Sequence, residues 1–362
     1  MELKLDTTII WQDPLPALGQ WILDQTYSQI WVLTDEHTYQ HCWPRLKPYL
    51  PASTRVLSIA SGEAQKNLHT CTFLWQQLTE AEADRRTLWL NLGGGVIGDM
   101  GGFCAATYKR GIDFVQIPTT LLAQVDASVG GKLGVDFQDF KNHIGVFALP
   151  QRVVIETAFL QTLPFQELRS GFAEIIKHCL IRDKAQWDDL QKMYGVEFWA
   201  AAQNGLPEVE NLRPLVLHSI ALKAGVVAED PREQGLRKIL NFGHTLGHAL
   251  ESYLLSFPHR QIRHGEAVAV GMWAEAWLAQ SLTGLPPASF RQIEVYLRAV
   301  YPKITWDEKE EKQIALLTRQ DKKNQAGQVK ASLLKDIGQA VYDVPLALEE
   351  VEAALRAYRE QR

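Results

Sequence analysis

The chain has 362 residues, of which 46% are hydrophobic, and this length predicts two domains, each with a buried core. A formal net charge of −5 argues against a nucleic-acid partner, and no apolar run approaches the roughly 18 residues that would cross a membrane. The charged N-terminus is unlike a signal peptide, and four widely spaced cysteines without a CxxC pair favour a reducing cytoplasm over a disulfide framework or a cysteine-based zinc site.

The first part of the chain alternates strand-like and helix-like segments. Short runs of apolar residues predict strands at residues 31–34, 55–59, 88–92 and 114–120. Ser61 is a candidate N-cap for a helix that continues to about Leu78. Strands and helices that alternate in this way predict a parallel sheet with covering helices.

A glycine-rich turn follows the strand at residues 88–92. Gly93 to Asp99 reads GGGVIGD, a formal match to G-x-G-x-x-G between a strand and a helix. Such a turn lets the backbone approach a pyrophosphate at the helix N-terminus, but a tight structural turn would read the same. No acidic residue ends the next strand, so Asp35, which ends the strand at residues 31–34, is the candidate for binding the ribose.

Two lysines follow in a glycine-containing region. Asp126 to Lys132 reads DASVGGK, but it is not a P-loop, because Asp126 replaces the first glycine and Leu133 replaces the Ser or Thr. Lys132, Lys141 and Asn142 together suit an anion, and solvated surface lysines are the alternative.

After Pro164 nearly every segment reads as a helix, with one extended patch near residues 329–334. In the sequence AEIIKHCLI, Glu174, Lys177 and His178 share one helical face by their spacing. A carboxylate in such an apolar helix needs a partner. Glu174 is therefore either a metal ligand or one half of an ion pair with Lys177.

Histidines gather between residues 235 and 272. His244 and His248 are four residues apart, and Arg237 and Asn241 precede them at spacings that predict one shared helical face. His264 opens a further helical run. Grouped imidazoles suit zinc, although an i,i+4 pair also occurs on ordinary surfaces. Glycines beside the histidines, at 243, 247 and 265, suggest close approach of a ligand or another helix.

Taken together, these motifs resemble those of the dehydroquinate synthase family. In order they are GGGVIGDMGGFCAATYKRG, IPTTLLAQVDASVGGKLGVD, FKNHIGVFALP, LRSGFAEIIKH, LNFGHTLGHALE and HGEAVAVGM, and they cover residues 61–271 densely. The resemblance implies an α/β N-terminal NAD-binding domain at residues 1–165 and an all-helical metal- and substrate-binding domain at residues 166–362. It also implies an active site between the domains and a homodimer.

The resemblance implies a phosphate-eliminating carbon–oxygen lyase of the shikimate pathway, which leads to aromatic amino acids. Its substrate would be 3-deoxy-D-arabino-heptulosonate 7-phosphate, and its products 3-dehydroquinate and phosphate. Bound NAD⁺ and one divalent metal, zinc or cobalt, would serve as cofactors. A ring hydroxyl is oxidised, phosphate leaves by β-elimination, the ketone is reduced back, and an aldol step closes the carbocycle.

The family's functional residues fall on positions that match its motifs. The metal ligands are Glu174, His244 and His264, so His248, a candidate ligand by spacing, is expected to face the substrate instead. The NAD⁺ positions are Asp35, Gly62, Glu63, Lys66, Gly95, Val96, Ile97, Gly98, Asp99, Thr119, Thr120, Lys132, Lys141, Phe159, Leu160, Gln161 and Thr162. The substrate-facing positions are Arg110, Asp126, Asn142, Lys177, Lys223, Arg237, Asn241, His248, and one or both of Lys322 and Lys323.

Three other functions fit parts of this pattern. Another sugar-phosphate cyclase, of the valiolone or inosose type, would act on a substrate without a carboxylate and would have less use for Arg237, Lys223 and Asn241. A metal-dependent polyol dehydrogenase would release NADH and need no phosphate pocket. An inactive paralogue would be a binding module, against which the intact Glu174, His244 and His264 argue.

Overall fold

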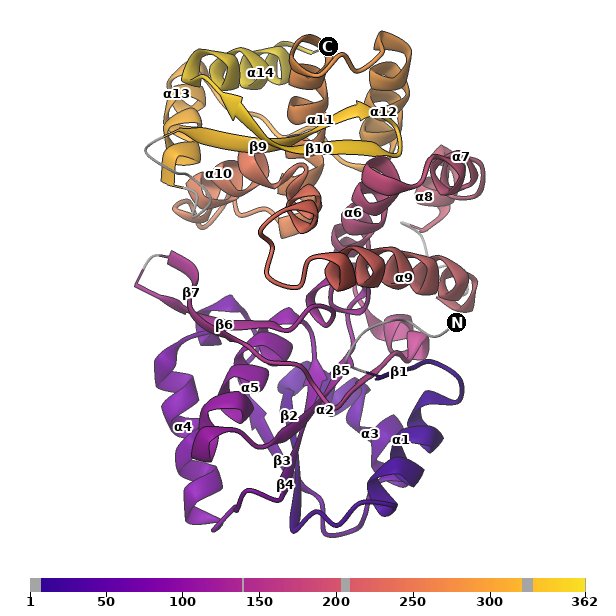
Figure 1. Ribbon diagram of the computed structural model, residues 1–362, viewed down its shortest axis with the longest axis vertical. Coiled ribbons are helices and arrows are strands. Elements are labelled where there is room, and N and C mark those ends of the chain that lie inside the picture. The colour runs from indigo at the N-terminus through magenta and orange to yellow at the C-terminus, as the bar shows by residue number, and fades with distance from the viewer. Residues whose placement is uncertain (1–7, 139, 203–208, 321–327, 362) are drawn as a thin grey trace. The chain divides into compact units, whose positions relative to one another are not determined.

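The computed structural model describes residues 8–138, 140–202, 209–320 and 328–361. The chain divides into two compact units (Figure 1). The first consists of Met1–Pro164 and Glu208–Gly225, and the second of Phe165–Pro207 and Val226–Arg362. Among the described helices, none combines the length and the apolar character needed to cross a membrane.

A parallel sheet forms the centre of the first unit, as the alternating pattern predicts. Its six described strands lie in the order β1-β8-β5-β4-β2-β3, and every neighbouring pair is parallel. The strands are β1 (Thr8–Ile10), β2 (Gln29–Asp35), β3 (Arg55–Ile59), β4 (Thr87–Gly93), β5 (Asp113–Pro118) and β8 (Arg152–Val154). The four strands predicted from the sequence are β2, β3, β4 and β5, and all four are confirmed.

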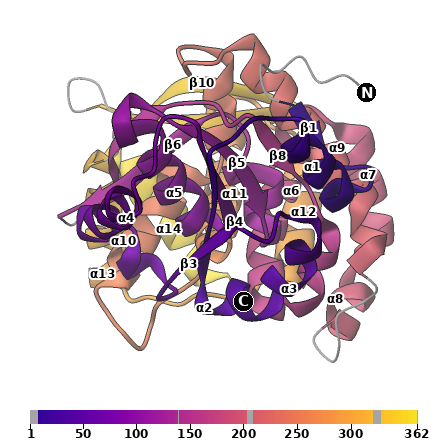
Figure 2. The same ribbon diagram turned by 90° about the horizontal axis from the view of Figure 1, so that it is seen from below.

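Alternate residues of the central strands enter two different cores, because successive side chains of a strand point to opposite faces. Trp31, Leu33 and Trp89 pack on one face with apolar residues of α4 and α5. Val32 and Leu90 pack on the other face with residues of α1 and α3. Figures 1 and 2 show α4 and α5 on one side of the strands and α1 and α3 on the other. Helices on both faces explain why β4 is buried along its whole length.

The helices of the first unit are α1 (Pro14–Leu23), α2 (Glu36–His41), α3 (Trp43–Leu46), α4 (Leu68–Glu80) and α5 (Gly95–Thr107). The predicted helix start at Ser61 is wrong. Residues Glu63–Gln65 form only a short 3₁₀ turn, and α4 begins after Asn67, whose side chain accepts a hydrogen bond from the backbone N–H of Thr70. An amide oxygen at the N-cap satisfies a donor that the helix itself leaves unpaired, so Asn67 does what was expected of Ser61.

An antiparallel hairpin, β6 (Lys132–Phe137) and β7 (Phe140–Phe147), lies beside this sheet and was not predicted. It carries Lys132, Lys141 and Asn142, the candidates for binding an anion. The hairpin is attached to the body of the unit, because the backbone N–H of Asp136 donates to the carbonyl of Lys66 at 2.8 Å.

The second unit is mainly helical, as the succession of helix-like segments after Pro164 predicts. Its helices are α6 (Phe165–Arg182), α7 (Lys184–Met193), α8 (Val196–Ala202), α9 (Arg213–Glu229, which begins in the first unit), α10 (His244–Leu255), α11 (His264–Leu282), α12 (Pro287–Val300), α13 (Glu308–Leu317) and α14 (Leu348–Glu360). The extended patch expected near residues 329–334 is confirmed as β9 (Val329–Asp336). It pairs antiparallel with β10 (Gln339–Leu346), so the unit contains a hairpin that an all-helical domain lacks.

Candidate functional site

Three histidines of the second unit converge. His244 and His248 lie one turn apart on α10, as their spacing predicts, and His264 is the first residue of α11, also as predicted. Their potential ligand nitrogens all lie within 4.8 Å of one another. Imidazoles that approach this closely from two helices are suited to bind a borderline divalent metal.

Glu174 of α6 approaches two of these rings with one carboxylate oxygen. Its Oε1 lies 3.4 Å from Nε2 of His244 and 3.9 Å from Nε2 of His264, and the side chain is fully buried. Two ligand atoms at tetrahedral positions around zinc, each about 2.0–2.1 Å from the ion, are separated by about 3.3 Å. Oε1 of Glu174 therefore lies from each histidine nitrogen at close to the spacing that a zinc-like ion requires.

The second oxygen of Glu174 pairs with the ammonium of Lys177, one turn further along α6. Both side chains are buried, and the contact joins Oε2 to Nζ. Sequence reasoning treated a metal ligand and an ion pair as alternatives for Glu174. The geometry allows both at once, because each carboxylate oxygen faces a different group.

The helix that carries His244 begins later than predicted. Arg237 and Asn241 lie in a 3₁₀ turn, Leu236–Asn241, and α10 starts only at His244. The expectation of one continuous helical face from Arg237 to His248 is therefore wrong. The break falls at Gly243, whose φ of +80° lies in the left-handed region that favours glycine.

A buried carboxylate that sequence reasoning missed holds this helix start. Glu275 of α11 is fully buried and accepts hydrogen bonds from the backbone N–H groups of Gly243 at 2.6 Å and Leu246 at 3.1 Å. These are donors that the first turn of α10 cannot satisfy internally. An acidic residue in the apolar run AVAVGMWAEAWLA was the available signal, since a buried carboxylate needs donors.

Both proposed histidine ligands are oriented through their Nδ1 atoms. Nδ1 of His244 lies 3.1 Å from the carbonyl oxygen of Phe242, and Nδ1 of His264 lies 3.2 Å from Oε2 of Glu251. Burial, and next the charge of Lys177, lower the pKa of His244, so this ring is neutral near pH 7. A neutral ring whose Nδ1 donates to a carbonyl keeps a lone pair on Nε2, the atom that faces Glu174.

Close helix packing brings Glu174 and His264 together. Gly265 donates its N–H to Oγ of Ser170 at 3.0 Å, and a Cβ built on Gly265 would lie 1.9 Å from the Ser170 carbonyl oxygen. Ser170 precedes Glu174 by one helical turn on α6. The glycine beside His264 is thus explained by the approach of another helix, which was one of the two possibilities stated from the sequence.

The predicted nucleotide-binding residues of the first unit follow the carboxyl ends of several strands. Asp35 ends β2, Gly62 and Glu63 follow β3, the Gly95–Asp99 segment follows β4, and Thr119 and Thr120 follow β5. Because the carboxyl ends of parallel strands meet at one edge of a sheet, these residues share that edge. Phe159 to Thr162, also nucleotide-binding candidates, form most of a 3₁₀ turn after β8.

The turn between β4 and α5 has the features of an anion site. Gly94 is the N-cap of α5, and no side chain among the described residues caps this helix. A Cβ on Gly94 would lie 3.0 Å from Cγ2 of Thr120, which explains the absence of a side chain there. The open N–H groups of the first turn therefore suit a pyrophosphate, and the residues present fit a dinucleotide.

A buried ion pair supports this turn. Nζ of Lys66 lies 2.6 Å from Oδ2 of Asp99, and both side chains are largely buried. Burial lowers the pKa of Lys66, but the charges of Asp99 and Glu63 outweigh burial and raise it overall. Lys66 is therefore a cation. A second ion pair nearby joins Oε1 of Glu63 to Nζ of Lys141 on β7, at 3.5 Å.

The other first-unit candidates have different surroundings. Nζ of Lys223, on α9, lies 2.6 Å from Oδ1 of Asp126 and donates to its carbonyl at 2.7 Å. Asn142 donates its backbone N–H to Asp136 at 2.7 Å. Arg110 is exposed and has a φ of +69°. Asp35 caps α2 by accepting from the N–H of Thr38 at 2.7 Å, so its Oδ1 is engaged in the helix start.

In the second unit, Arg237 and Asn241 are tied to the segment before them. The Arg237 guanidinium donates to the carbonyl of Pro231 at 2.7 Å, and the Asn241 amide donates to Glu233 at 2.7 Å. Lys322 and Lys323 lie outside the described residues.

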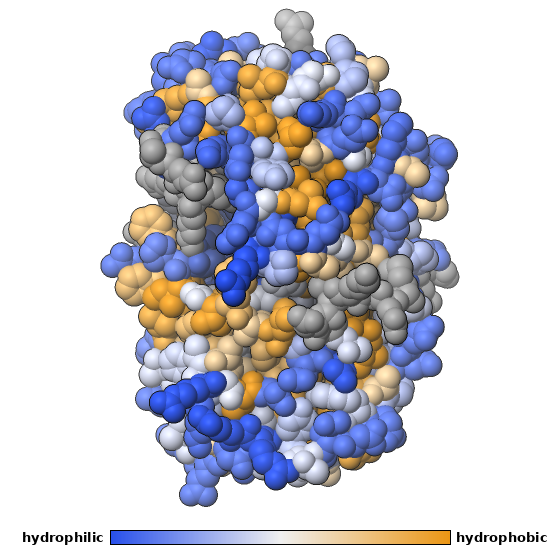
Figure 3. Space-filling model, viewed as in Figure 1, coloured by the Kyte–Doolittle hydropathy of each residue, from blue (hydrophilic) through white to orange (hydrophobic). Residues whose placement is uncertain are grey.

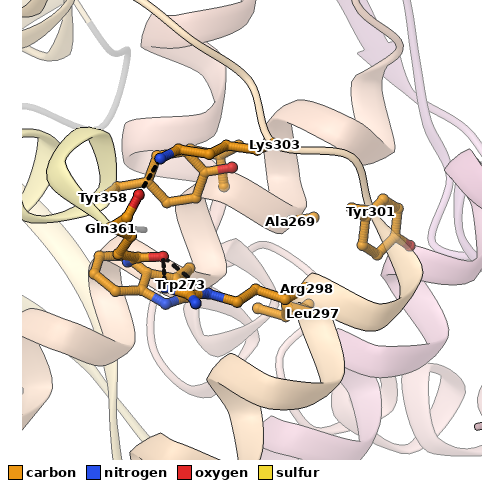
Figure 4. Close-up of a pocket in the computed structure, with 9 residues that line it drawn as sticks. Ala269, Trp273, Leu297, Arg298, Tyr301, Lys303, Tyr358 and Gln361 are labelled. Carbon is orange, nitrogen blue, oxygen red and sulfur yellow. Dashed lines mark hydrogen bonds between the residues drawn. The ribbon is translucent and has the colours of Figure 1, made fainter. Parts of the chain in front are cut away.

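A separate cavity of about 280 Å³ lies in the second unit, lined in part by Trp273, Leu297, Tyr301 and Tyr358. Arg298 and Lys303 both bind Gln361 at its edge (Figure 4). None of its lining residues is a predicted site residue.

Comparison with known proteins places this architecture in the dehydroquinate synthase-like fold. A 2-epi-5-epi-valiolone synthase from Streptomyces hygroscopicus, with NAD⁺ and Zn²⁺ bound, superposes with a TM-score of 0.84 at 25% identity, covering 100% of this chain and 98% of that one.

Sequence comparison is more specific. Residues 56–170 match the family described as 3-dehydroquinate synthase N-terminal, and residues 171–324 match 3-dehydroquinate synthase C-terminal. The 3-dehydroquinate synthase of Parabacteroides distasonis is 38% identical over 97% of both chains, and that of Bordetella pertussis is 42% identical over 81% of both. The chain belongs to the 3-dehydroquinate synthase family, and the predicted resemblance is confirmed.

Proposed function

We infer that the chain converts 3-deoxy-D-arabino-heptulosonate 7-phosphate to 3-dehydroquinate and phosphate. The observation that carries this inference is the match to both halves of the 3-dehydroquinate synthase family, in order, over residues 56–324. The Glu174, His244 and His264 arrangement supports it independently, because a catalytically inactive relative would have no need to keep a buried carboxylate beside two imidazoles.

The residues fit two cofactors, NAD⁺ and one divalent metal. When bound, NAD⁺ supplies transient oxidation of a ring hydroxyl and the later re-reduction, and the metal polarises the neighbouring oxygens of the substrate. Glu174, His244 and His264 would hold the metal. The first turn of α5 would bind the pyrophosphate. Beside it, burial raises the pKa of Asp99, and the paired Lys66 opposes that rise.

The chain's own residues supply charge and position. Lys177 balances part of the charge of the buried Glu174 carboxylate through Oε2, while Oε1 faces His244 and His264. Lys223 fixes both the backbone and the side chain of Asp126, which orders a segment predicted to face the substrate. A substrate that carries both a carboxylate and a phosphate requires several cations, and the lysines and arginines at the predicted positions provide them.

Arg237 is the proposed reader of the substrate carboxylate. Its guanidinium offers a planar pair of donors that match a carboxylate, whereas a valiolone- or inosose-type substrate has no such group. This residue therefore favours the dehydroquinate reaction over those of the other cyclases.

The domains of the chain divide the cofactors between them. We assign NAD⁺ binding to a domain at residues 1–165, and metal and substrate binding to a domain at residues 166–362. A homodimer is supported by apolar side chains exposed on and beside the β6–β7 hairpin, where Phe140 is 47% and Phe147 66% exposed. Apolar residues are visible on the flank of the molecule where this hairpin lies (Figure 3).

Four buried free cysteines support a reducing cytoplasm.

The function is tested by incubating the protein with the heptulosonate phosphate, NAD⁺ and Co²⁺ or Zn²⁺. We expect phosphate release, a product identified by NMR as 3-dehydroquinate, and no accumulation of NADH at 340 nm over many turnovers. Phosphate release with a different carbocycle would assign the protein to another cyclase. NADH that grows in proportion to turnover would indicate a polyol dehydrogenase.

A further inference from the structure

Glu251 is a buried acidic residue of the second unit that none of the predicted roles uses. It lies on α10, three residues after His248, and its side chain is 8% exposed. Its Oε2 lies 3.2 Å from Nδ1 of His264, which is the first residue of the next helix. The contact thus joins α10 directly to the side chain at the start of α11.

We propose that Glu251 is a positioning residue that holds the His264 imidazole with Nε2 directed at the metal site of Glu174 and His244. The proposal rests on the metal site described under the proposed function. It adds a residue that would touch neither metal nor substrate and would act through a ligand.

The hydrogen-bonding capacity of the Glu251 carboxylate decides which nitrogen of His264 carries the proton. An ionised carboxylate only accepts hydrogen bonds, so the proton of the neutral His264 ring must be on Nδ1. The lone pair is then on Nε2, the atom that lies 3.9 Å from Oε1 of Glu174. The contact therefore selects both the tautomer and the rotation of the ring that a metal ligand needs.

The two histidines receive this support from different sources. His244 is buried and uses the carbonyl of Phe242, a neutral acceptor in its own segment. His264 is more exposed, with 27% of its side chain accessible, and depends on a charged acceptor from another helix. A partly exposed ring has fewer packing contacts to fix it, so its orientation depends more strongly on the hydrogen bond at Nδ1. A carboxylate acceptor also raises the basicity of the ligating nitrogen more than a carbonyl does.

An alternative role for Glu251 is purely structural, in which it pins α10 to α11 whatever His264 does. The two roles differ in what they affect. A structural pin would lower stability with or without metal, whereas a positioning residue would lower metal affinity in a protein that remains folded.

The test measures metal affinity rather than turnover. Metal-free protein is titrated with Zn²⁺ in competition with a chromophoric chelator, and with Co²⁺ by its visible absorption. We expect Glu251→Gln to weaken binding by about 10-fold, because an amide keeps an acceptor oxygen but loses the charge, and Glu251→Ala by up to about 100-fold. Folding of each metal-free variant is checked by circular dichroism. If Glu251→Ala is unstable, the conclusion is drawn from Glu251→Gln alone, because this substitution conserves the side-chain volume.

Glu294→Gln is the matched control. Glu294 is similarly buried, with a side chain that is 9% exposed, but it lies on α12 and pairs with Arg291 and Arg298. The amide substitution there should leave both metal affinities at the wild-type value. If Glu294→Gln weakens metal binding as much as Glu251→Gln, the effect is a general loss of stability and the proposal is overturned.

A double-mutant cycle separates this proposal from the assignment of the ligands. If Glu251 acts through His264, Glu251→Gln should cause no further loss of affinity in a His264→Ala background. Equal losses in both backgrounds would overturn the positioning role. A His264→Ala variant that binds metal like wild type would instead overturn the metal assignment itself, whatever Glu251 does. Wild-type affinity in Glu251→Gln, with His264→Ala impaired, would refute the positioning role alone.

Discussion

The start of α10 depends on one buried carboxylate, and removing it should loosen the helix that carries His244. Glu275 is fully buried and accepts from the N–H groups of Gly243 and Leu246. Glu275→Ala leaves two buried amide donors without this acceptor. Each buried donor that is left unsatisfied costs about 1–3 kcal/mol, so the loss of local stability should be about 2–6 kcal/mol. Glu275→Gln keeps one acceptor oxygen and should lose about half as much.

The effect is best measured locally, because unfolding of a chain with two compact units need not be two-state. Hydrogen exchange of the metal-free protein reports the opening of individual segments. A loss of 2 kcal/mol corresponds to about 30-fold faster exchange of the amides at residues 243–250. Glu294→Ala is the control. Its former partners Arg291 and Arg298 are substantially exposed and can turn to water, so the exchange protection of residues 243–250 should be unchanged. Wild-type protection of these amides in Glu275→Ala would refute the reasoning.

Three further predictions concern the proposed site and its surroundings. His264→Ala should lose both bound metal and activity, as measured by metal analysis after dialysis, and full metal occupancy would refute the ligand assignment. Arg237→Ala should lower kcat/KM for the heptulosonate phosphate by at least about 30-fold, or ~2 kcal/mol, and should affect an analogue without the carboxylate far less. Burial raises the pKa of Asp230, but its hydrogen bonds from the N–H groups of Gln234, Gly235 and Arg237 lower that pKa overall. The contribution of Asp230 to stability is therefore complete above the ordinary aspartate pKa of about 3.9, and it is lost as the pH falls through the lower pKa of the folded state. Asp230→Asn should therefore destabilise the protein at pH 6 more than at pH 3 in urea unfolding, and an equal effect at both pH values would contradict this account.

The parts of the fold that depend on local pattern could be predicted. The strands β2 to β5 are short apolar runs with turns between them, and the glycine-rich turn after β4 has a recognisable spacing. His244, His248 and His264 could be grouped because two of them are one helical turn apart and the third opens the next helix.

The parts of the fold that depend on contacts between distant residues could not be predicted from the sequence. The β6–β7 hairpin has Gln138 in a left-handed conformation at its turn, where a glycine or asparagine would have indicated the turn. The break before α10 is stabilised by Glu275, 32 residues later, and LRKILNFGHTLGHAL reads as one helix without it. Glu251 was missed for a similar reason, since its partner His264 is 13 residues away across a loop.

The division of the chain has a consequence for its synthesis. The first compact unit is completed by residues 208–225, which lie in the chain after the first segment of the second unit. The Asp126 carboxylate and the Lys223 ammonium that pairs with it are 97 positions apart. At a synthesis rate of roughly 5–20 residues per second, Lys223 is added about 5–20 s after Asp126. A nascent chain that ends at residue 164 has the whole parallel sheet but lacks this cation, so the first unit cannot reach its final form until well over half of the protein has been made.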